Sequence, residues 1–204
     1  MKPRPRGKKP VPVRANKLRI IGGAWRGRLI AATEGDEIRP TSDRAREALF
    51  NRLLHGFTDR GFRLQDARVA DVFAGTGALG LEALSRGASH VTFIERDPAA
   101  AALIRRNIAT LGAEDRAFVL AVDATTVPRA AEACDLIVAD PPYAEDIGGA
   151  ALAALARQRW LKPGALAAIE TEASAPTLSV EGFTTIDRRD YGRAAFTYLQ
   201  FQKT

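Results

Sequence analysis

The sequence predicts an α/β fold of the Rossmann-like kind, with a seven-stranded, mostly parallel sheet and helices on both faces. From Val69 onward, short apolar runs alternate with segments of helical periodicity, which is the pattern of βαβ units. Chemically active residues stand at the ends of four of these runs: Asp71 with Gly75, Glu95, Asp123 and Asp140. Ligands of open α/β sheets bind beyond the carboxyl ends of the strands, so these residues predict one site at that rim.

The segment before this pattern predicts a small hairpin and helix extension. Short strands at 18–21 and 28–31 flank the glycine-rich stretch 22–27. Thr41 or Ser42 can cap a helix from Asp43 to Leu54, where apolar residues recur at helical spacing. We therefore expect a disordered basic tail over residues 1–16, a hairpin and helix extension over 17–60 and an α/β domain over 61–204.

The remaining elements follow from the alternation of apolar runs and helical segments. We expect strands at 69–74, 90–94, 117–122, 134–139 and 165–170, and helices at 77–86, 98–111, 126–133 and 147–158. Two further strands, 184–189 and 195–202, flank the turn residues 190–193.

Positive charge is concentrated at the N-terminus. Residues 1–31 hold ten of the 30 Lys and Arg residues and none of the 24 acidic residues. Four prolines interrupt residues 1–16, so this arm is not expected to fold alone or to act as a signal peptide. Such single-sign blocks commonly bind nucleic acid, and a solubilising tail is the alternative.

Other bulk features point to a cytoplasmic protein. Cys134 is the single cysteine, so no disulfide framework is possible and a reducing compartment fits. No stretch approaches the roughly 18 apolar residues of a membrane span. His55 and His90 lack partners at metal-ligand spacing, so we expect no metal site, and we expect a monomer.

The tetrapeptide Asp140-Pro141-Pro142-Tyr143 is suited to holding a planar exocyclic amine. A carboxylate and a backbone carbonyl that accept its hydrogen bonds would favour the pyramidal form, whose lone pair is free to attack. The prolines restrict the backbone so that the Asp140 side chain and the Pro141 carbonyl can face one volume. Tyr143 offers a face for base stacking, worth roughly 1–3 kcal/mol. A simple strand-ending turn is the alternative.

Gly75 to Gly80 form a G-x-G-x-x-G loop, and Glu95 lies 20 residues beyond Gly75. This spacing alone fits either NAD or another nucleotide-like cofactor. Asp71 favours the cationic end of S-adenosyl-L-methionine, because a pyrophosphate would be repelled there. Glu95 could then hold the ribose hydroxyls, and Asp123 with Ala124 could meet the adenine.

These motifs together resemble a class I S-adenosylmethionine-dependent methyltransferase. Upstream, residues 18–23 with Arg26-Gly27-Arg28, and then residues 38–51, resemble the RsmD family of 16S ribosomal RNA guanine-N2 methyltransferases. The similarity covers about residues 18–202, and the basic extension before Lys17 departs from the family pattern.

The resemblance implies methyl transfer to the N2 amine of a guanine in small-subunit ribosomal RNA, within a partly assembled subunit. It implies catalytic roles for Asp140, Pro141, Pro142 and Tyr143. The implied cofactor residues are Asp71, Phe73, Gly75, Thr76, Gly77, Glu95, Arg96, Asp123 and Ala124, with Arg39 and Thr41 over the methionyl end. The implied RNA contacts are Arg26, Arg28, Arg44, Arg46, Tyr191 and Arg193.

Three other functions remain open at this stage. An adenine-N6 methyltransferase could use the same Asp-Pro-Pro-Tyr turn, and only the upstream motifs favour guanine. An NAD(P)-dependent oxidoreductase would have no use for that turn or for the basic arm. A non-catalytic RNA-binding assembly factor would be expected to have lost a cofactor acid or the turn.

Overall fold

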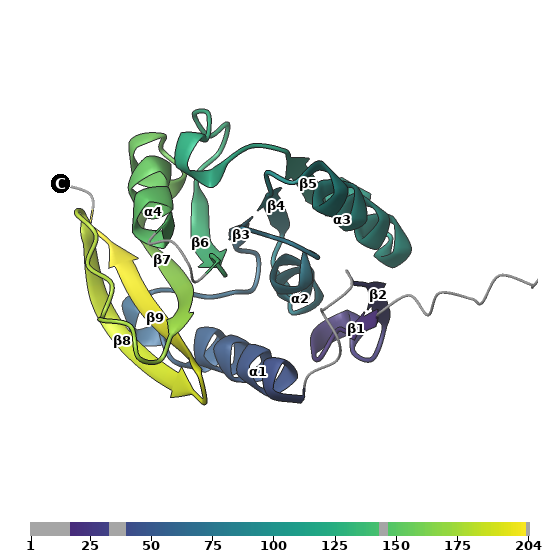
Figure 1. The fold of residues 1–204 in the computed structure, drawn as a ribbon, viewed down its shortest axis with the longest axis horizontal. Coiled ribbons are helices and arrows are strands. Elements are labelled where there is room, and N and C mark those ends of the chain that lie inside the picture. The colour runs from purple at the N-terminus through teal and green to yellow at the C-terminus, as the bar shows by residue number, and fades with distance from the viewer. Residues whose placement is uncertain (1–16, 33–39, 143–146, 203–204) are drawn as a thin grey trace, which may run out of the picture.

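The computed structural model describes residues 17–32, 40–142 and 147–202, and Figure 1 shows its ribbon. One seven-stranded sheet has the order β5-β4-β3-β6-β7-β9-β8. Its strands are β3 (Arg68–Val72), β4 (His90–Ile94), β5 (Ala117–Leu120), β6 (Cys134–Ala139), β7 (Leu161–Glu172), β8 (Phe183–Tyr191) and β9 (Ala194–Phe201). The pairs from β5 to β7 are parallel, and β9 is antiparallel to both β7 and β8. The predicted fold class is confirmed.

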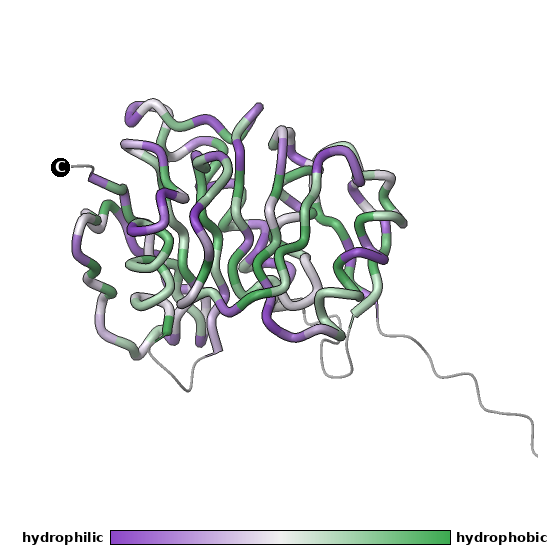
Figure 2. The backbone as a smooth tube through the Cα atoms, turned by 90° about the horizontal axis from the view of Figure 1, so that it is seen from above, coloured by the Kyte–Doolittle hydropathy of each residue, from purple (hydrophilic) through white to green (hydrophobic). Residues whose placement is uncertain are grey.

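Helices cover both faces of this sheet because successive strand residues point to opposite sides. In β6, Leu136 and Val138 belong to one apolar cluster, and Ile137 and Ala139 belong to the other. The first cluster includes residues of α1 (Pro40–His55), α2 (Ala78–Ser85) and α3 (Pro98–Leu111), and the second includes residues of α4 (Ile147–Arg157). Figure 2 shows hydrophobic residues along the central strands and hydrophilic residues at the outer turns.

Several element boundaries differ from the sequence expectation by a few residues. The first helix begins at Pro40, so Thr41 and Ser42 lie in its first turn instead of capping it. The helix expected at 126–133 is wrong, since this region contains only the 3₁₀ turn η4 (Ala124–Thr126). Val127 has extended backbone geometry (ψ 143°), as the following Pro128 requires. The other 3₁₀ turns are η1 (Gly23–Trp25), η2 (Thr58–Arg60) and η3 (Glu114–Arg116).

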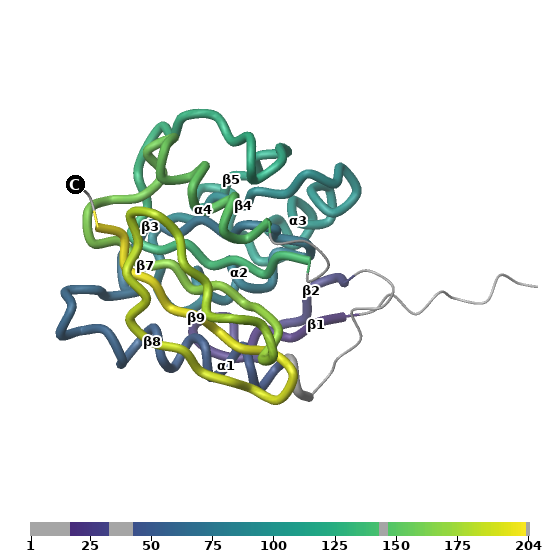
Figure 3. The backbone as a smooth tube through the Cα atoms, turned by 60° about the vertical axis from the view of Figure 1, so that its left-hand side comes forward, coloured from purple at the N-terminus to yellow at the C-terminus, as the bar shows by residue number. Residues whose placement is uncertain are grey.

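The C-terminal strands and the first helix lie side by side, as Figures 1 and 3 both show. An ion pair between Arg52 of α1 and Asp187 of β8, with 2.8 Å between Nη2 and Oδ2, joins them. Phe57 and Tyr198 add a ring contact with centroids 5.2 Å apart. The N-terminal helix therefore packs on the antiparallel end of the sheet.

The hairpin of β1 (Lys17–Arg19) and β2 (Leu29–Ala31) is attached to α2 through a buried carboxylate. Glu82 has no exposed surface, and it accepts hydrogen bonds from the backbone N–H groups of Ile21 and Gly22, each at 2.8 Å. It also pairs with Arg86 at 2.7 Å. This closed set of partners satisfies the buried charge and fixes the hairpin on the helix.

We expect Glu82→Ala to destabilise the protein by about 3–5 kcal/mol, because it leaves the Arg86 charge and two buried N–H groups without their acceptor. Urea unfolding measures this change, with the exposed residue Glu181 mutated to Ala as the control. Equal stability of the two variants would mean that the other contacts of the hairpin, such as those of Arg46 and Asn107, are enough to hold it.

Candidate functional site

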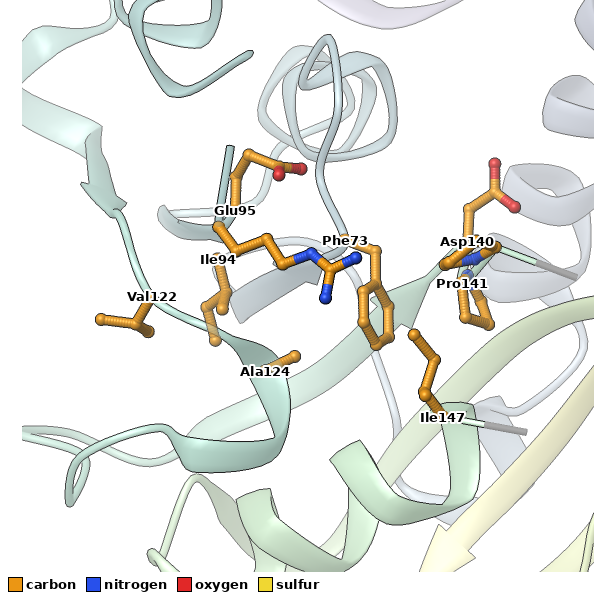
Figure 4. Close-up of a pocket in the computed structure, with 10 residues that line it drawn as sticks. Phe73, Ile94, Glu95, Val122, Ala124, Asp140, Pro141 and Ile147 are labelled. Carbon is orange, nitrogen blue, oxygen red and sulfur yellow. The ribbon is translucent and has the colours of Figure 1, made fainter. Parts of the chain in front are cut away.

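A pocket of about 340 Å³ lies at the carboxyl ends of the parallel strands, at the edge where the chain order reverses between β3 and β6. Figure 4 shows Glu95 and Asp140 on either side of the Phe73 ring. The lining residues are Phe73, Ile94, Glu95, Arg96, Val122, Ala124, Asp140, Pro141, Pro142 and Ile147. The structure thus brings together residues from four loops that the sequence placed at separate strand ends.

The glycine loop between β3 and α2 is held in place from two sides. Its Gly75 N–H donates to Glu95 Oε2 at 2.8 Å, and the Thr76 carbonyl accepts from Asn107 Nδ2 at 3.0 Å. Gly77 has φ 79°, and a Cβ there would lie 3.2 Å from the Phe93 ring. The loop is therefore fixed before any ligand binds, and a side chain at residue 77 would be both strained and crowded.

Phe73 adopts a backbone conformation that non-glycine residues rarely take, with φ 59°. Its ring lines the pocket. Such a conformation costs on the order of 1–3 kcal/mol and is found preferentially where function requires a side chain to face a ligand. The strain supports the prediction that Phe73 contacts the cofactor.

Glu95 lines the pocket and also holds the neighbouring backbone in place. Besides accepting from Gly75, its carboxylate accepts from the backbone N–H of Asp97 at 2.8 Å. A carboxylate oxygen accepts more than one hydrogen bond, so these contacts leave acceptor capacity for ribose hydroxyls. The structure places Glu95 beside the glycine loop, and its contact with a ribose stays a prediction.

Asp71 occupies a different position from the one that the sequence suggested. It is 1% exposed, it is absent from the pocket lining, and its Oδ2 accepts from the Gly80 N–H of α2 at 2.8 Å. Burial, together with the nearby charges of Asp140 and Glu95, raises its pKa well above the ordinary range. In this structure Asp71 fixes the helix after the glycine loop, and it is not part of the pocket lining.

Asp123 and Ala124, which were predicted to act together, differ in their position relative to the pocket. The Asp123 carboxylate accepts from both the N–H (2.8 Å) and the hydroxyl (2.6 Å) of Thr125, and these bonds, with Arg96 at 3.4 Å, lower its pKa. Ala124 lines the pocket, whereas Asp123 does not. Asp123 therefore shapes the turn whose next residue forms the pocket wall.

The Asp140-Pro141-Pro142 turn follows directly from β6. Asp140 is exposed, and its N–H lies 3.4 Å from the Val72 carbonyl, which continues the pairing with β3. Pro141 is buried against Gly148 of α4. The turn is thus anchored behind the pocket while its carboxylate stays accessible. Tyr143, Arg39 and the Thr41 side chain lie outside the described part of the structure.

The predicted RNA contacts lie in different environments. Arg26, Arg44 and Arg193 are exposed, and Tyr191 packs its ring against Phe196 with centroids 5.9 Å apart. Arg28 is exposed and donates to the Thr110 carbonyl.

Arg46 differs from these residues because it is buried. It donates to the Arg19 carbonyl (3.0 Å) and pairs with Asp43 (2.7 Å). Its pKa is lowered mainly by burial. The structure gives Arg46 a role in joining α1 to the hairpin, and its burial argues against the predicted RNA contact.

Sequence reasoning missed the apolar walls of the pocket and one polar support. Ile94, Val122 and Ile147 line the pocket, and the only signal for the first two was their position beside Glu95 and Asp123. Asn107 is fully buried and bonds both the N–H and the carbonyl of Ala31 as well as the glycine loop. Its spacing, three residues after Ile104 and four before Leu111, is the signal that could have placed it on the buried face of α3.

Other candidate chemistry is weak in the described residues. They contain no group of three or more His, Cys, Asp or Glu side chains that could hold a metal ion. Burial raises the pKa of the Cys134 thiol to about 12, which makes it a poor nucleophile. Among the helices described, none has the length and apolar character needed to cross a membrane.

Comparisons with known proteins agree with this geometry. Residues 18–200 match the family model described as "Conserved hypothetical protein 95". The ribosomal RNA small subunit methyltransferase D of Haemophilus influenzae is 34% identical over 90% of this chain and 94% of its own length, and that of Escherichia coli is 37% identical over 81% and 80%. The solved structure of Escherichia coli yhhF is 34% identical, with a TM-score of 0.78 over 92% of this chain and 99% of that chain.

Structural neighbours of the chain are class I methyltransferases, and this fold and family imply S-adenosylmethionine as the cofactor. The family model covers nearly the whole described chain, and the two relatives exceed 30% identity over most of it. The chain belongs to the RsmD family of methyltransferases.

Proposed function

We propose that this protein transfers a methyl group from S-adenosyl-L-methionine to the N2 amine of a guanine in small-subunit ribosomal RNA. The observation that carries the proposal is the pocket in which Glu95 and the Asp140-Pro141-Pro142 turn meet. The two curated relatives are named as methyltransferases of ribosomal small-subunit RNA. The enzyme acts in the cytoplasm as a monomer, on RNA of a partly assembled subunit.

The residues of the pocket fit S-adenosylmethionine. Ile94, Val122 and Ala124 form an apolar wall for a flat adenine ring, and Glu95 accepts the hydroxyls of its ribose. A Cβ on Gly75 would meet only the Phe73 carbonyl oxygen, at 4.0 Å, so the loop leaves open space for the methionyl end. Two carboxylates, Glu95 and Asp140, favour a cationic ligand over a pyrophosphate, which weighs against NAD.

When bound, the cofactor supplies a methyl group on a cationic sulfur, which leaves as a neutral thioether. Asp140 and the Pro141 carbonyl accept hydrogen bonds from the two N–H groups of the guanine amine. These bonds direct the lone pair of the nitrogen at the methyl carbon. As the N–C bond forms and the C–S bond breaks, the nitrogen becomes cationic and acidic, and water or Asp140 takes its proton. Rate enhancement comes mainly from positioning, which can supply roughly 7–11 kcal/mol.

The first role to test is that of Asp140 as the hydrogen-bond acceptor for the guanine amine. We expect Asp140→Ala to lower kcat by about 100- to 1,000-fold, because a preorganised acceptor of the reacting group is lost, while the Kd for S-adenosylmethionine stays within a few-fold. Tritium transfer to small-subunit RNA and calorimetry measure the two quantities, with the exposed Asp115 mutated to Ala as the control. Equal losses in rate and cofactor affinity would contradict this division of roles.

Glu95 should behave in the opposite way. We expect Glu95→Gln to weaken S-adenosylmethionine binding by on the order of tenfold, with kcat at saturating cofactor nearly retained, since a ribose contact contributes uniform binding. Titration of the cofactor into the variant, beside the exposed control Glu114→Gln, measures the change. If the variant binds S-adenosylmethionine with the wild-type Kd, then Glu95 only supports the glycine loop and does not contact the cofactor.

The basic arm provides a separate test of RNA binding. Residues 1–16 hold six basic residues, and we expect their deletion to reduce the slope of log K against log salt by up to about five units. The Kd for S-adenosylmethionine and the identity of the methylated base should not change. An unchanged slope would mean that the arm serves only solubility.

A further inference from the structure

A second carboxylate lies beside the amine-holding turn. In the parallel pair β6 and β7, Val138 is level with Ala168 and Ala139 with Ile169. The next step along both strands brings Asp140 level with Glu170, and neighbouring strands are about 4.8 Å apart. Continued by one residue beyond the end of β6, this register places the two acids next to each other at the rim.

Both acids belong to the same face of the sheet. In each strand, residues two positions earlier, Val138 and Ala168, pack in the cluster that contains α1 and α2, whereas Ala139 and Ile169 pack in the other. Because side chains alternate along a strand, Asp140 and Glu170 are placed on the α1 side. The electrostatic influence of Asp140 on buried Asp71, which shares that side, agrees with this placement.

Glu170 also borders a second cavity at the same rim. It is half-buried and lies in the wall of a second pocket of about 360 Å³, which shares Pro141 and Pro142 with the first. On the neighbouring strand β9 it is paired with Phe196, and the Tyr191 ring packs against Phe196. The second pocket therefore extends from the two prolines of the turn to Glu170, and the aromatic pair lies beside Glu170 on the neighbouring strand.

The chemistry of guanine matches two adjacent acceptors. Guanine presents N1–H and the N2 amine side by side as donors, whereas adenine presents a bare N1 lone pair next to its amine. An ionised carboxylate only accepts hydrogen bonds. Adenine held by its amine at Asp140 would turn its N1 lone pair toward the second carboxylate, which is repulsive.

We propose that Glu170 accepts the N1–H of the target guanine while Asp140 and the Pro141 carbonyl hold its N2 amine. Glu170 is then the residue that selects guanine over adenine at a turn suited to either amine. This inference rests on the proposed function, since it requires guanine N2 as the acceptor of the methyl group.

The test removes the N1–H donor from the base and, separately, the Glu170 carboxylate from the protein. The methylated guanine is first mapped in small-subunit RNA with tritiated S-adenosylmethionine and the full-length wild-type protein. RNA is then ligated with 2,6-diaminopurine at that position, which keeps the N2 amine but has no N1–H. Wild type, Glu170→Gln, Glu170→Asp and the exposed control Glu181→Gln are compared by kcat/KM on both RNAs.

We expect wild type and Glu181→Gln to prefer guanine by on the order of 100-fold, the size of one good hydrogen-bonded base contact. In Glu170→Gln the preference should fall to within about tenfold, because the amide can donate to N1 of diaminopurine as well as accept from guanine. Glu170→Asp, which retains a carboxylate, should still prefer guanine. The Kd for S-adenosylmethionine and the melting temperature should remain near the wild-type values in Glu170→Gln.

An unchanged preference for guanine in Glu170→Gln would overturn the assignment. This outcome differs from failure of the proposed function. In that case the wild-type protein would methylate no guanine N2 in the first step.

Discussion

Parallel pairing of β6 with β3 is the constraint on which the site depends. The pairing makes Val72 level with Ala139, so the chain leaves both strands at the same edge of the sheet. The glycine loop then turns one way and the Asp140 turn the other, which opens the pocket between them. A slip of one residue would exchange the two faces of β6 and would carry the Asp140 side chain away from the cofactor loop.

The rigidity of this rim comes from polar side chains that hold the backbone of the glycine loop and of the helix after it. Asp71 holds the start of α2, Glu95 holds Gly75, and Asn107 holds the Thr76 carbonyl. These bonds offset the cost of a loop with several residues at positive φ, Phe73 among them. The site is thereby organised before binding, which reduces the ordering cost that a ligand must meet.

Two buried polar side chains also join the hairpin to the glycine loop and to the helix after it. Asn107 bonds Ala31 on one side and the glycine loop on the other, and Glu82 bonds Ile21 and Gly22 from the helix that follows that loop. The exposed Arg26 and Arg28 are therefore carried on a hairpin whose position is fixed relative to the pocket. In the proposed function, this arrangement sets the distance between the RNA backbone and the base that reacts.

The sequence by itself determined the α/β fold, the order of most elements and the residues at the strand ends, because these depend on local periodicity and on turn chemistry. It also identified Glu95, Ala124 and the Asp140 turn as parts of one rim. Only the tertiary structure decided which acids face the pocket and which form hydrogen bonds elsewhere. Asp71 and Asp123, like Glu95, stand at strand ends in the sequence. In the structure their carboxylates accept hydrogen bonds from Gly80 and Thr125. Arg46 likewise looked like its exposed neighbour Arg44. The physical reason is that burial and hydrogen-bond partners are set by elements distant in the chain, such as the Glu82 contact with the hairpin 60 residues earlier, and local pattern carries no record of them.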